Sequence, residues 1–165
     1  MLILMVCTGN ICRSAMAERI LQKAVEDRGL DNIEVISAGI SDEEQGNPID
    51  PRAVQILRHQ GYRTEDHSAK QVTEEMVQEA DLILAMTRQH AKALRRIAKV
   101  AGISKSDRRK KIRLYREFGT VEPLDGNFDI NDPWYGDMED FIESLDYLED
   151  GVEGVLAHIN GNWDN

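Results

Sequence analysis

The stretch that decides the fold is the first fourteen residues, which join an apolar run to a short loop and the start of a helix. It reads Met1-Leu2-Ile3-Leu4-Met5-Val6-Cys7-Thr8-Gly9-Asn10-Ile11-Cys12-Arg13-Ser14. A short, continuous apolar run such as residues 2–6 is typical of a strand covered on both faces of its sheet. Apolar residues at helical spacing follow over residues 14–28, so the segment predicts a strand, a loop and a helix.

Strands and helices alternate along the rest of the chain. Apolar runs predict further strands at residues 33–36, 81–86 and 112–115. Helical spacing predicts helices at residues 51–60, 88–101 and 137–160, and Thr73 is a candidate cap for another helix. Polar stretches with Gly and Pro predict loops at residues 37–50 and 119–136. The alternation favours an α/β fold with a parallel sheet and helices on both faces. In such sheets ligands bind beyond the carboxyl ends of the strands, where the first loop lies.

The composition is that of one soluble globular domain, which we expect to span residues 1–165. Hydrophobic residues make up 41% of the chain and charged residues 30%. No segment reaches membrane length and no signal peptide precedes the first strand, so the sequence predicts a cytoplasmic protein without membrane insertion. The two cysteines, Cys7 and Cys12, share one loop. This is neither a disulfide framework nor a complete zinc site, which leaves reactive thiols or an inert buried pair.

Charge is strongly segregated along the chain. The net charge of −10 argues against a general nucleic-acid binder. This total is the sum of three unequal blocks, with −7 in residues 1–87, +11 in residues 88–116 and −14 in residues 117–165. Two interpretations of the basic block stay open. It is either a solvated face that the acidic block partly neutralises, or a strip on which substrate docks.

The first loop has the residue types that bind and attack a phosphate. Backbone N–H groups between a strand and a helix N-terminus form an anion nest, and Gly9 and Asn10 are the residues that most readily adopt positive φ there. Arg13 can bind two phosphate oxygens, and the positive field favours the thiolate of Cys7, a nucleophile toward phosphorus. The loop lacks the Gly-Lys-Ser/Thr motif of nucleotide-binding loops, which argues against a nucleotide site. The other alternative is that Cys7 is a buried, inert thiol.

Phosphoryl transfer to a thiol also needs an acid for the leaving oxygen, and Asp132 is the best candidate. It lies in the loop Asn131-Asp132-Pro133-Trp134-Tyr135-Gly136. Pro133 stiffens this loop, and Trp134 and Tyr135 can wall a flat substrate. Taken alone an Asp-Pro pair is usually only a turn, so its interpretation depends on the cysteine loop.

The sequence resembles the low-molecular-weight protein tyrosine phosphatases of bacterial type over essentially its whole length. The resemblance rests on residues 7–14 and on Met16-Ala17-Glu18, Ser37-Ala38-Gly39, Gly46-Asn47-Pro48-Ile49-Asp50, residues 69–73, residues 81–84 and Asp132-Pro133-Trp134-Tyr135. It implies a four-stranded parallel sheet with the phosphate-binding loop after the first strand. It also implies hydrolysis of phosphotyrosine in proteins without metal or organic cofactor, with a bacterial tyrosine kinase as a candidate partner.

The resemblance also implies the role of each site residue. Cys7 attacks the phosphate to form a cysteinyl phosphate, Arg13 binds the phosphate, and Asp132 acts as general acid and then base. Substrate or its phosphate is expected to contact Thr8, Gly9, Asn10, Ile11, Cys12, Ser14, Trp134 and Tyr135. Within this set Ser14 would donate to the Cys7 sulfur and Asn10 would hold the loop in shape, braced by Ser37 and His67. Cys12 would trap oxidised Cys7 as a disulfide, unless it is a packing residue.

The chain departs from the family pattern near the substrate. Family members commonly have an aromatic residue where this chain has Glu43, which leaves Trp134 and Tyr135 as the wall, with Ile40 adding apolar surface. Thr87 stands where many tyrosine phosphatases have Asp, and the pattern Ala85-Met86-Thr87-x-x-His90 resembles the bacterial protein arginine phosphatases. Those typically carry Thr where this chain has Ile11, whose branched side chain crowds the site and favours phosphotyrosine. An arginine phosphatase is therefore the alternative, ahead of an arsenate reductase or a non-catalytic phosphate-binding module.

Overall fold

A computed structural model describes residues 1–163 and has a four-stranded sheet at its centre. The strand order is β2-β1-β3-β4, and all neighbouring strands are parallel. The strands are β1 (Leu2–Cys7), β2 (Glu34–Gly39), β3 (Leu82–Ala85) and β4 (Ile112–Leu114). The predicted α/β fold with a parallel sheet of four strands is confirmed. The single domain expected over residues 1–165 includes residues 164 and 165, which lie outside the described part.

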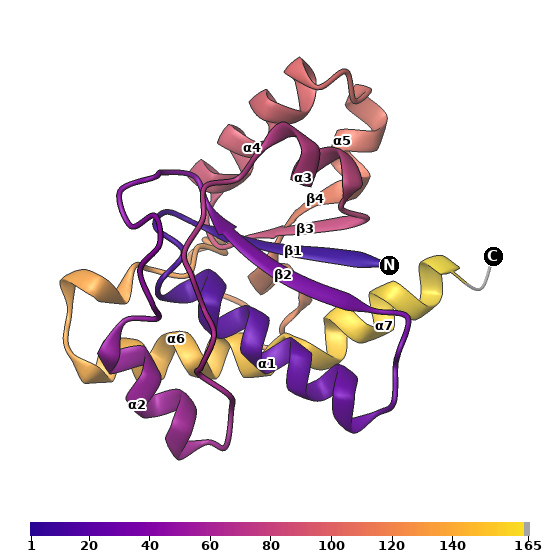
Figure 1. Ribbon diagram of the computed structural model, residues 1–165. Helices are drawn as coiled ribbons and strands as arrows, with labels where there is room; N and C mark the ends of the chain where they lie inside the picture. Colours follow the sequence, from indigo (N-terminus) through magenta and orange to yellow (C-terminus); the bar gives the residue numbers. More distant parts are fainter. Residues whose placement is uncertain (164–165) are drawn as a thin grey trace.

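Helices cover both faces of the sheet, as predicted (Figure 1). One layer holds α1 (Arg13–Asp27), α2 (Pro51–His59), α6 (Met138–Asp150) and α7 (Val152–Trp163). The opposite layer holds α3 (Glu74–Glu79), α4 (Arg88–Val100) and α5 (Lys105–Lys111). Two short 3-10 turns, η1 (Tyr115–Phe118) and η2 (Pro133–Tyr135), lie in the connections. No helix among the described residues is both long and apolar enough to cross a bilayer.

The central strand β1 contributes to two separate cores. Ile3, Met5 and Cys7 pack with residues of α1 and α6, whereas Leu4 and Val6 pack with residues of α4. Residues 3–6 are all 0% exposed. Because both faces of β1 are buried, the strand reads as a continuous apolar run rather than as an alternation.

Strand β2 is longer than the predicted strand at residues 33–36. Ser37, Ala38 and Gly39 continue the pairing with Met5, Val6 and Cys7 of β1. The polar Ser37 suggested a loop, but it is 1% exposed and its hydroxyl accepts a hydrogen bond from Asn10. A buried hydroxyl with a partner is compatible with a strand, and here it links the strand to the first loop.

The predicted helix at residues 137–160 is two helices, α6 and α7, separated at Gly151. The Tyr115 hydroxyl donates to the carbonyl of Leu148, which an unbroken helix would use for the N–H of Val152. The Tyr115 ring also approaches Gly151 closely, since a Cβ there would lie 2.6 Å from Cε1. A side chain inserted from outside therefore ends the first helix.

The short helix α5 has no counterpart among the predicted elements. Its sequence is Lys-Ser-Asp-Arg-Arg-Lys-Lys, and none of these residues is buried. Without an apolar face it has no helical periodicity, so the pattern on which the other helices were predicted is missing. Ser104 caps it by accepting a hydrogen bond from the N–H of Asp107.

Candidate active site

The loop after β1 is held from outside through its carbonyl groups. Four of them accept hydrogen bonds from other segments: Cys7 from Ile40 N, Thr8 from Ser41 N, Asn10 from His67 and Ile11 from Asp50 N. The carbonyl of Cys12 accepts the first helical bond of α1, from Met16 N. With these carbonyls turned outward, the loop N–H groups face its concave side. Such a ring of N–H groups at the N-terminus of α1 binds an anion.

Asn10 holds the shape of the loop with its side-chain amide. The residue is 0% exposed and has φ +63°, the left-handed conformation predicted for it. Its Nδ2 donates to Ser14 Oγ at 2.8 Å and to Ser37 Oγ at 2.9 Å, and its Oδ1 accepts from Lys70 N at 3.1 Å. Three anchors on one buried amide fix the turn, as the resemblance implied.

Gly9 does not adopt the positive φ predicted for it. Among the described residues, positive φ occurs at Asn10, at Asp66 and at glycines outside this loop. Close packing accounts for Gly9 instead, because a Cβ there would lie 3.1 Å from Glu44 Cγ. Gly39 is tighter, since its Cβ would lie 2.6 Å from the carbonyl oxygen of Thr8. Both glycines let neighbouring segments approach the loop closely.

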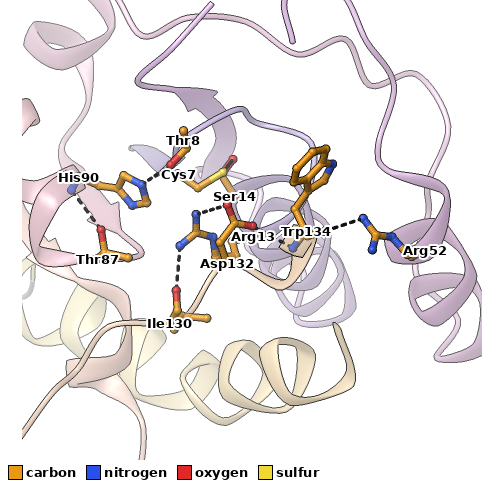
Figure 2. Close-up of polar contacts among 10 residues, drawn as sticks. All are labelled: Cys7, Thr8, Arg13, Ser14, Arg52, Thr87, His90, Ile130, Asp132 and Trp134. Atoms are coloured by element: carbon orange, nitrogen blue, oxygen red, sulfur yellow. Dashed lines mark hydrogen bonds and ion pairs between the residues drawn. The ribbon is translucent and has the colours of Figure 1, made fainter. Parts of the chain in front are cut away.

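The Cys7 sulfur lies within the loop and is in contact with Ser14 (Figure 2). Cys7 is 2% exposed, and its Sγ is 3.0 Å from Ser14 Oγ. Because Ser14 Oγ already accepts a hydrogen bond from Asn10, its own proton is available to the sulfur. The Ser14 hydroxyl is therefore placed to donate a hydrogen bond to the Cys7 sulfur.

Arg13 and Asp132 meet beside this cysteine (Figure 2). Arg13 is 3% exposed; its Nη1 donates to the carbonyl of Ile130 at 2.8 Å, and its Nη2 is 3.4 Å from Asp132 Oδ2. The other oxygen of Asp132 accepts from Trp134 N at 3.0 Å. The Nε of Arg13 is buried and has no partner within residues 1–163, which leaves a donor for an oxyanion.

A cavity of about 170 Å³ opens over the loop. Its lining consists of Cys7, Thr8, Gly9, Ile11, Cys12, Arg13, Ser41, Glu43, Glu44, Asp132, Trp134 and Tyr135. Trp134 and Tyr135 pack edge to face at 5.0 Å and remain 48% and 83% exposed, as expected of a wall. Ile40 is absent from this lining and packs against the core under α4, because β2 continues to Gly39 and turns Ile40 away.

Cys12 is the second thiol of the loop and also borders the cavity. It is 4% exposed, and burial, followed by the negative charge of Asp50, raises the pKa of its thiol far above the usual range. Both cysteines are free thiols. Burial therefore favours the protonated thiol of Cys12, which leaves Cys7 as the candidate nucleophile toward phosphate. Within residues 1–163 no three His, Cys, Asp or Glu side chains are grouped so as to hold a metal ion.

His67 braces the loop from the far side, as the resemblance implied. Its Nε2 is 2.6 Å from the carbonyl oxygen of Asn10, which can only accept, so Nε2 carries the proton. Burial lowers the pKa of His67, which favours this neutral form. Ser37 acts from the neighbouring strand through its bond with Asn10.

Two residues at the site have no counterpart in the sequence-based predictions. Arg52 donates to the carbonyls of Trp134 and Gly136, each at 3.2 Å, and pairs with Asp50. Arg52 thereby ties residues 131–136, the loop that contains Asp132 and that we call the acid loop, to the start of α2. His90 places Nε2 2.8 Å from Thr8 Oγ1 (Figure 2).

The only sequence signal for either residue was the Thr87-x-x-His90 pattern. It marked a resemblance to arginine phosphatases rather than a contact with the loop.

The family model "Low molecular weight phosphotyrosine protein phosphatase" matches residues 2–164. The chain belongs to this family of hydrolases. The resemblance stated from the motifs is thereby confirmed.

Similar proteins agree with this family. A low molecular weight protein-tyrosine-phosphatase of Streptomyces coelicolor is 37% identical over 93% of this chain and 90% of its own. Among solved structures, Vibrio vulnificus Wzb in complex with benzylphosphonate has a TM-score of 0.75 and 32% identity, covering 93% and 95% of the two chains. The arginine phosphatase YwlE, as a C7S mutant with a phosphorylated active-site serine, has a TM-score of 0.80 and 31% identity over 99% of each chain.

Proposed function

We propose that the chain hydrolyses phosphotyrosine in proteins through a cysteinyl-phosphate intermediate, as a single phosphatase domain. One observation carries this proposal: Cys7, Arg13 and Asp132 line one small cavity over an anion-binding loop, and the Cys7 sulfur is 3.0 Å from the Ser14 hydroxyl. A non-catalytic phosphate site needs the loop and Arg13, but it needs neither a thiol at the centre nor a carboxyl group at the rim.

Substrate binding uses the loop as it stands. The phosphate group enters the concave side, where the loop N–H groups and the N-terminus of α1 meet three of its oxygens. The Nε of Arg13 and one Nη group provide two parallel donors for two oxygens. Because Arg13 is already held by the Ile130 carbonyl, it loses little freedom when phosphate binds.

In the first chemical step the Cys7 thiolate attacks phosphorus opposite the ester oxygen. An S–P bond forms, the P–O bond to the phenol breaks, and Asp132 gives its proton to the leaving oxygen. Loop N–H groups and Arg13 stabilise the charge on the transferring group, which passes between sulfur and oxygen in line.

In the second step water hydrolyses the cysteinyl phosphate. The Asp132 carboxylate now takes a proton from the attacking water, a P–O bond forms and the S–P bond breaks. The electron pair returns to the Cys7 sulfur, where the Ser14 hydroxyl at 3.0 Å donates a hydrogen bond and favours departure as thiolate. In the relative YwlE a serine in the active site carries a phosphoryl group, which supports such an intermediate here.

The shape of the cavity supports an aromatic substrate. An apolar cavity of about 150 Å³ accommodates a benzene ring, and this one measures about 170 Å³ with Trp134 and Tyr135 on one side. The branched side chain of Ile11 also lines it, whereas Thr87 caps α4 and lies outside the lining. The benzylphosphonate held by Wzb likewise joins a phenyl ring to a phosphorus oxyanion through one bridging atom.

A second candidate, protein arginine phosphatase, is favoured by the carboxylates of Glu43 and Glu44, which line the same cavity. They repel a phosphate dianion but attract the guanidinium group of phosphoarginine. The family includes both activities among the structures similar to this chain.

The test is a panel of phosphotyrosine and phosphoarginine peptides of one sequence at matched concentrations, with Cys7→Ser as the control. We expect phosphotyrosine to be hydrolysed with the higher kcat/KM and Cys7→Ser to be inactive. Full activity of Cys7→Ser would contradict the mechanism, and a preference for phosphoarginine would select the second candidate.

We further propose that Cys12 traps oxidised Cys7, which mass spectrometry after mild peroxide treatment would detect as a disulfide.

A further inference from the structure

Helix α4 carries five basic residues on one exposed face, which we call the α4 strip. It consists of Arg88, Lys92, Arg95, Arg96 and Lys99, all exposed. The opposite face of the helix, with Ala91, Leu94 and Ala98, is buried against the sheet. The spacing of three and four residues keeps the five cations on consecutive turns of the same side.

The strip is almost free of internal counterions. Arg88 Nε lies 3.6 Å from Asp129, but within residues 1–163 no carboxylate lies within 4 Å of the cationic nitrogens of the other four residues. Cations three and four residues apart repel one another and destabilise a helix. An anionic segment bound along α4 would relieve this repulsion.

The acidic block does not neutralise the strip. Helices α6 and α7, which hold many of its acidic residues, cover the opposite face of the sheet from α4 and α5 (Figure 1). Across residues 88–116 and 117–163 only two ion pairs form, Arg88 with Asp129 and Arg113 with Glu117. The side of the sheet with α6 and α7 is therefore acidic, and the side with α4 and α5 is basic apart from α3, which carries Glu74, Glu75 and Glu79 and packs against α4.

The strip begins beside the active site. Helix α4 follows β3, the neighbour of β1, so Arg88 lies near the edge of the sheet that holds the phosphate loop. His90, two residues further along, is 2.8 Å from Thr8 of that loop. The backbone N–H of Arg88 also donates to Asp129, three residues before Asp132.

The other side of the cavity has the opposite charge. The loop after β2, on the far side of β1, contains Asp42, Glu43 and Glu44, and the last two line the cavity. The sheet order β2-β1-β3 thus sets acidic residues on one side of the phosphate loop and the strip on the other. A peptide that crosses the cavity therefore passes from acidic side chains on one side to basic side chains on the other.

We propose that the α4 strip docks an acidic segment next to the phosphotyrosine of a substrate protein. The inference rests on the proposed phosphatase activity and adds a substrate preference to it. At a rise of about 1.5 Å per residue, Arg88 to Arg96 spans roughly 12 Å, the length of about four extended residues. The acidic residues of the substrate would lie on one side of its phosphotyrosine, and that side would lie over α4.

The overall charge favours a short peptide over larger anions. A membrane surface or a nucleic acid is large enough to meet the acidic remainder of the molecule as well. The net charge of the whole chain, with the basic block included, is −10. A short segment is influenced mainly by charges within about 8 Å at physiological salt, and the charged side chains on the exposed face of α4 are the five cations of the strip.

The test compares phosphotyrosine peptides of equal length that carry four Asp, four Gln or four Lys on either side of the tyrosine. We expect Asp on one side to raise kcat/KM over Gln by about tenfold at low salt, and this advantage to vanish at high salt. The variant Lys92→Glu/Arg95→Glu/Arg96→Glu should lose or reverse the advantage. Its matched control, Lys105→Glu/Arg109→Glu/Lys110→Glu on α5, makes the same change in net charge away from the cavity and should keep it.

A small aryl phosphate separates docking from catalysis, and both variants should hydrolyse it at the wild-type rate. If the reversed variant does not fold, Lys92→Gln/Arg95→Gln/Arg96→Gln replaces it and should reduce the advantage to about twofold or less.

Equal kcat/KM for the Asp and Gln peptides in the wild-type protein would overturn the docking proposal and leave the phosphatase intact. Equal losses in the α4 and α5 variants would overturn it as well. So would an α4 variant that binds DNA or phosphatidylserine vesicles less well while its peptide kinetics stay unchanged. A wild-type protein that hydrolyses no aryl phosphate would instead overturn the proposed function.

Discussion

The phosphate loop and the acid loop contribute to one cavity but are held in different ways. Residues 7–14 are largely buried and are fixed by the Asn10 amide and by carbonyl bonds to three other segments, at residues 40–41, 50 and 67. Residues 131–136 are largely exposed and are held by Arg13, Arg52 and the turn at Asp132. The first loop is a rigid part of the core, whereas the second is a surface segment that few contacts position. Changes in the first should therefore affect folding and catalysis together, and changes in the second catalysis alone.

The largest effect is expected for Asp132→Asn, which tests the acid loop. Without the proton donor, kcat for an aryl phosphate with a poor leaving group should fall about 10²-fold or more. For a substrate whose phenolate leaves readily, kcat/KM should change little, because it reports only the steps up to release of the phenol and these then need no proton from Asp132. Steady-state rates over a series of substituted phenyl phosphates measure this, together with an unchanged urea midpoint. An equal loss for every leaving group would remove Asp132 as the general acid.

Asn10→Ala probes the phosphate loop and should cost about 2 kcal/mol of unfolding free energy as well as activity. The substitution removes three hydrogen bonds and replaces Asn, which tolerates the left-handed φ of +63°, with Ala, which adopts it less readily. Asn10→Gly loses the same bonds but accepts the φ angle, so it should be more stable than Asn10→Ala by about 1 kcal/mol. Urea denaturation measures both. Wild-type stability in Asn10→Ala would contradict the view of the loop as part of the core.

A pH effect on stability is expected from His90, which braces the phosphate loop at Thr8. Burial, with a further contribution from nearby Arg13, lowers its pKa from 6.5 to about 4, although Asp129 acts in the opposite direction. The unfolded chain therefore binds a proton below pH 6.5 that the folded protein takes up only near pH 4, so stability falls as the pH falls. Between pH 7.5 and 5.5 the loss should be about 1 kcal/mol.

Urea midpoints at the two pH values, compared between the wild-type protein and His90→Asn, isolate this contribution. His67 and His158 also have lowered pKa values and change stability in the same direction, but they are present in both proteins. The same pH dependence in both would assign the effect to those histidines instead.

The smallest effect is expected for Arg52→Ala, which loosens the acid loop without removing its acid. Its two bonds, to the carbonyls of Trp134 and Gly136, are solvent-exposed and each contributes about 1 kcal/mol or less. We expect kcat to fall a few-fold, and more for poor leaving groups, with a small change in stability. Arg52→Lys, which keeps one donor, should be intermediate. A loss as large as that of Asp132→Asn would show that the acid loop depends on this single anchor.

Much of the fold was predictable because its signals are local. A continuous apolar run indicates β1 because both faces of that strand are buried. Pro51 marks a helix start because the first turn does not need its missing N–H, and Thr73 marks one because its side chain accepts from the N–H of Met76. Signals failed where a distant residue intervened. Tyr115 ends α6 at Gly151, 36 positions away in sequence, and α5 has no apolar face to reveal it. Local patterns contain no information on such contacts.

The sequence by itself determined the chemistry of the site. Cys7, Arg13 and Ser14 lie within eight residues, so a strand, a loop and a helix suffice to bring them together, and Asp132 was predicted because phosphoryl transfer to a thiol requires an acid. The tertiary structure alone decided which residues hold that chemistry in place. His67, His90 and Arg52 contact partners 57, 82 and 82 or more positions away, because the sheet order sets β1 between β2 and β3. The same order sets acidic residues on one side of the cavity and the α4 strip near the other, since it fixes which segments meet at the carboxyl edge.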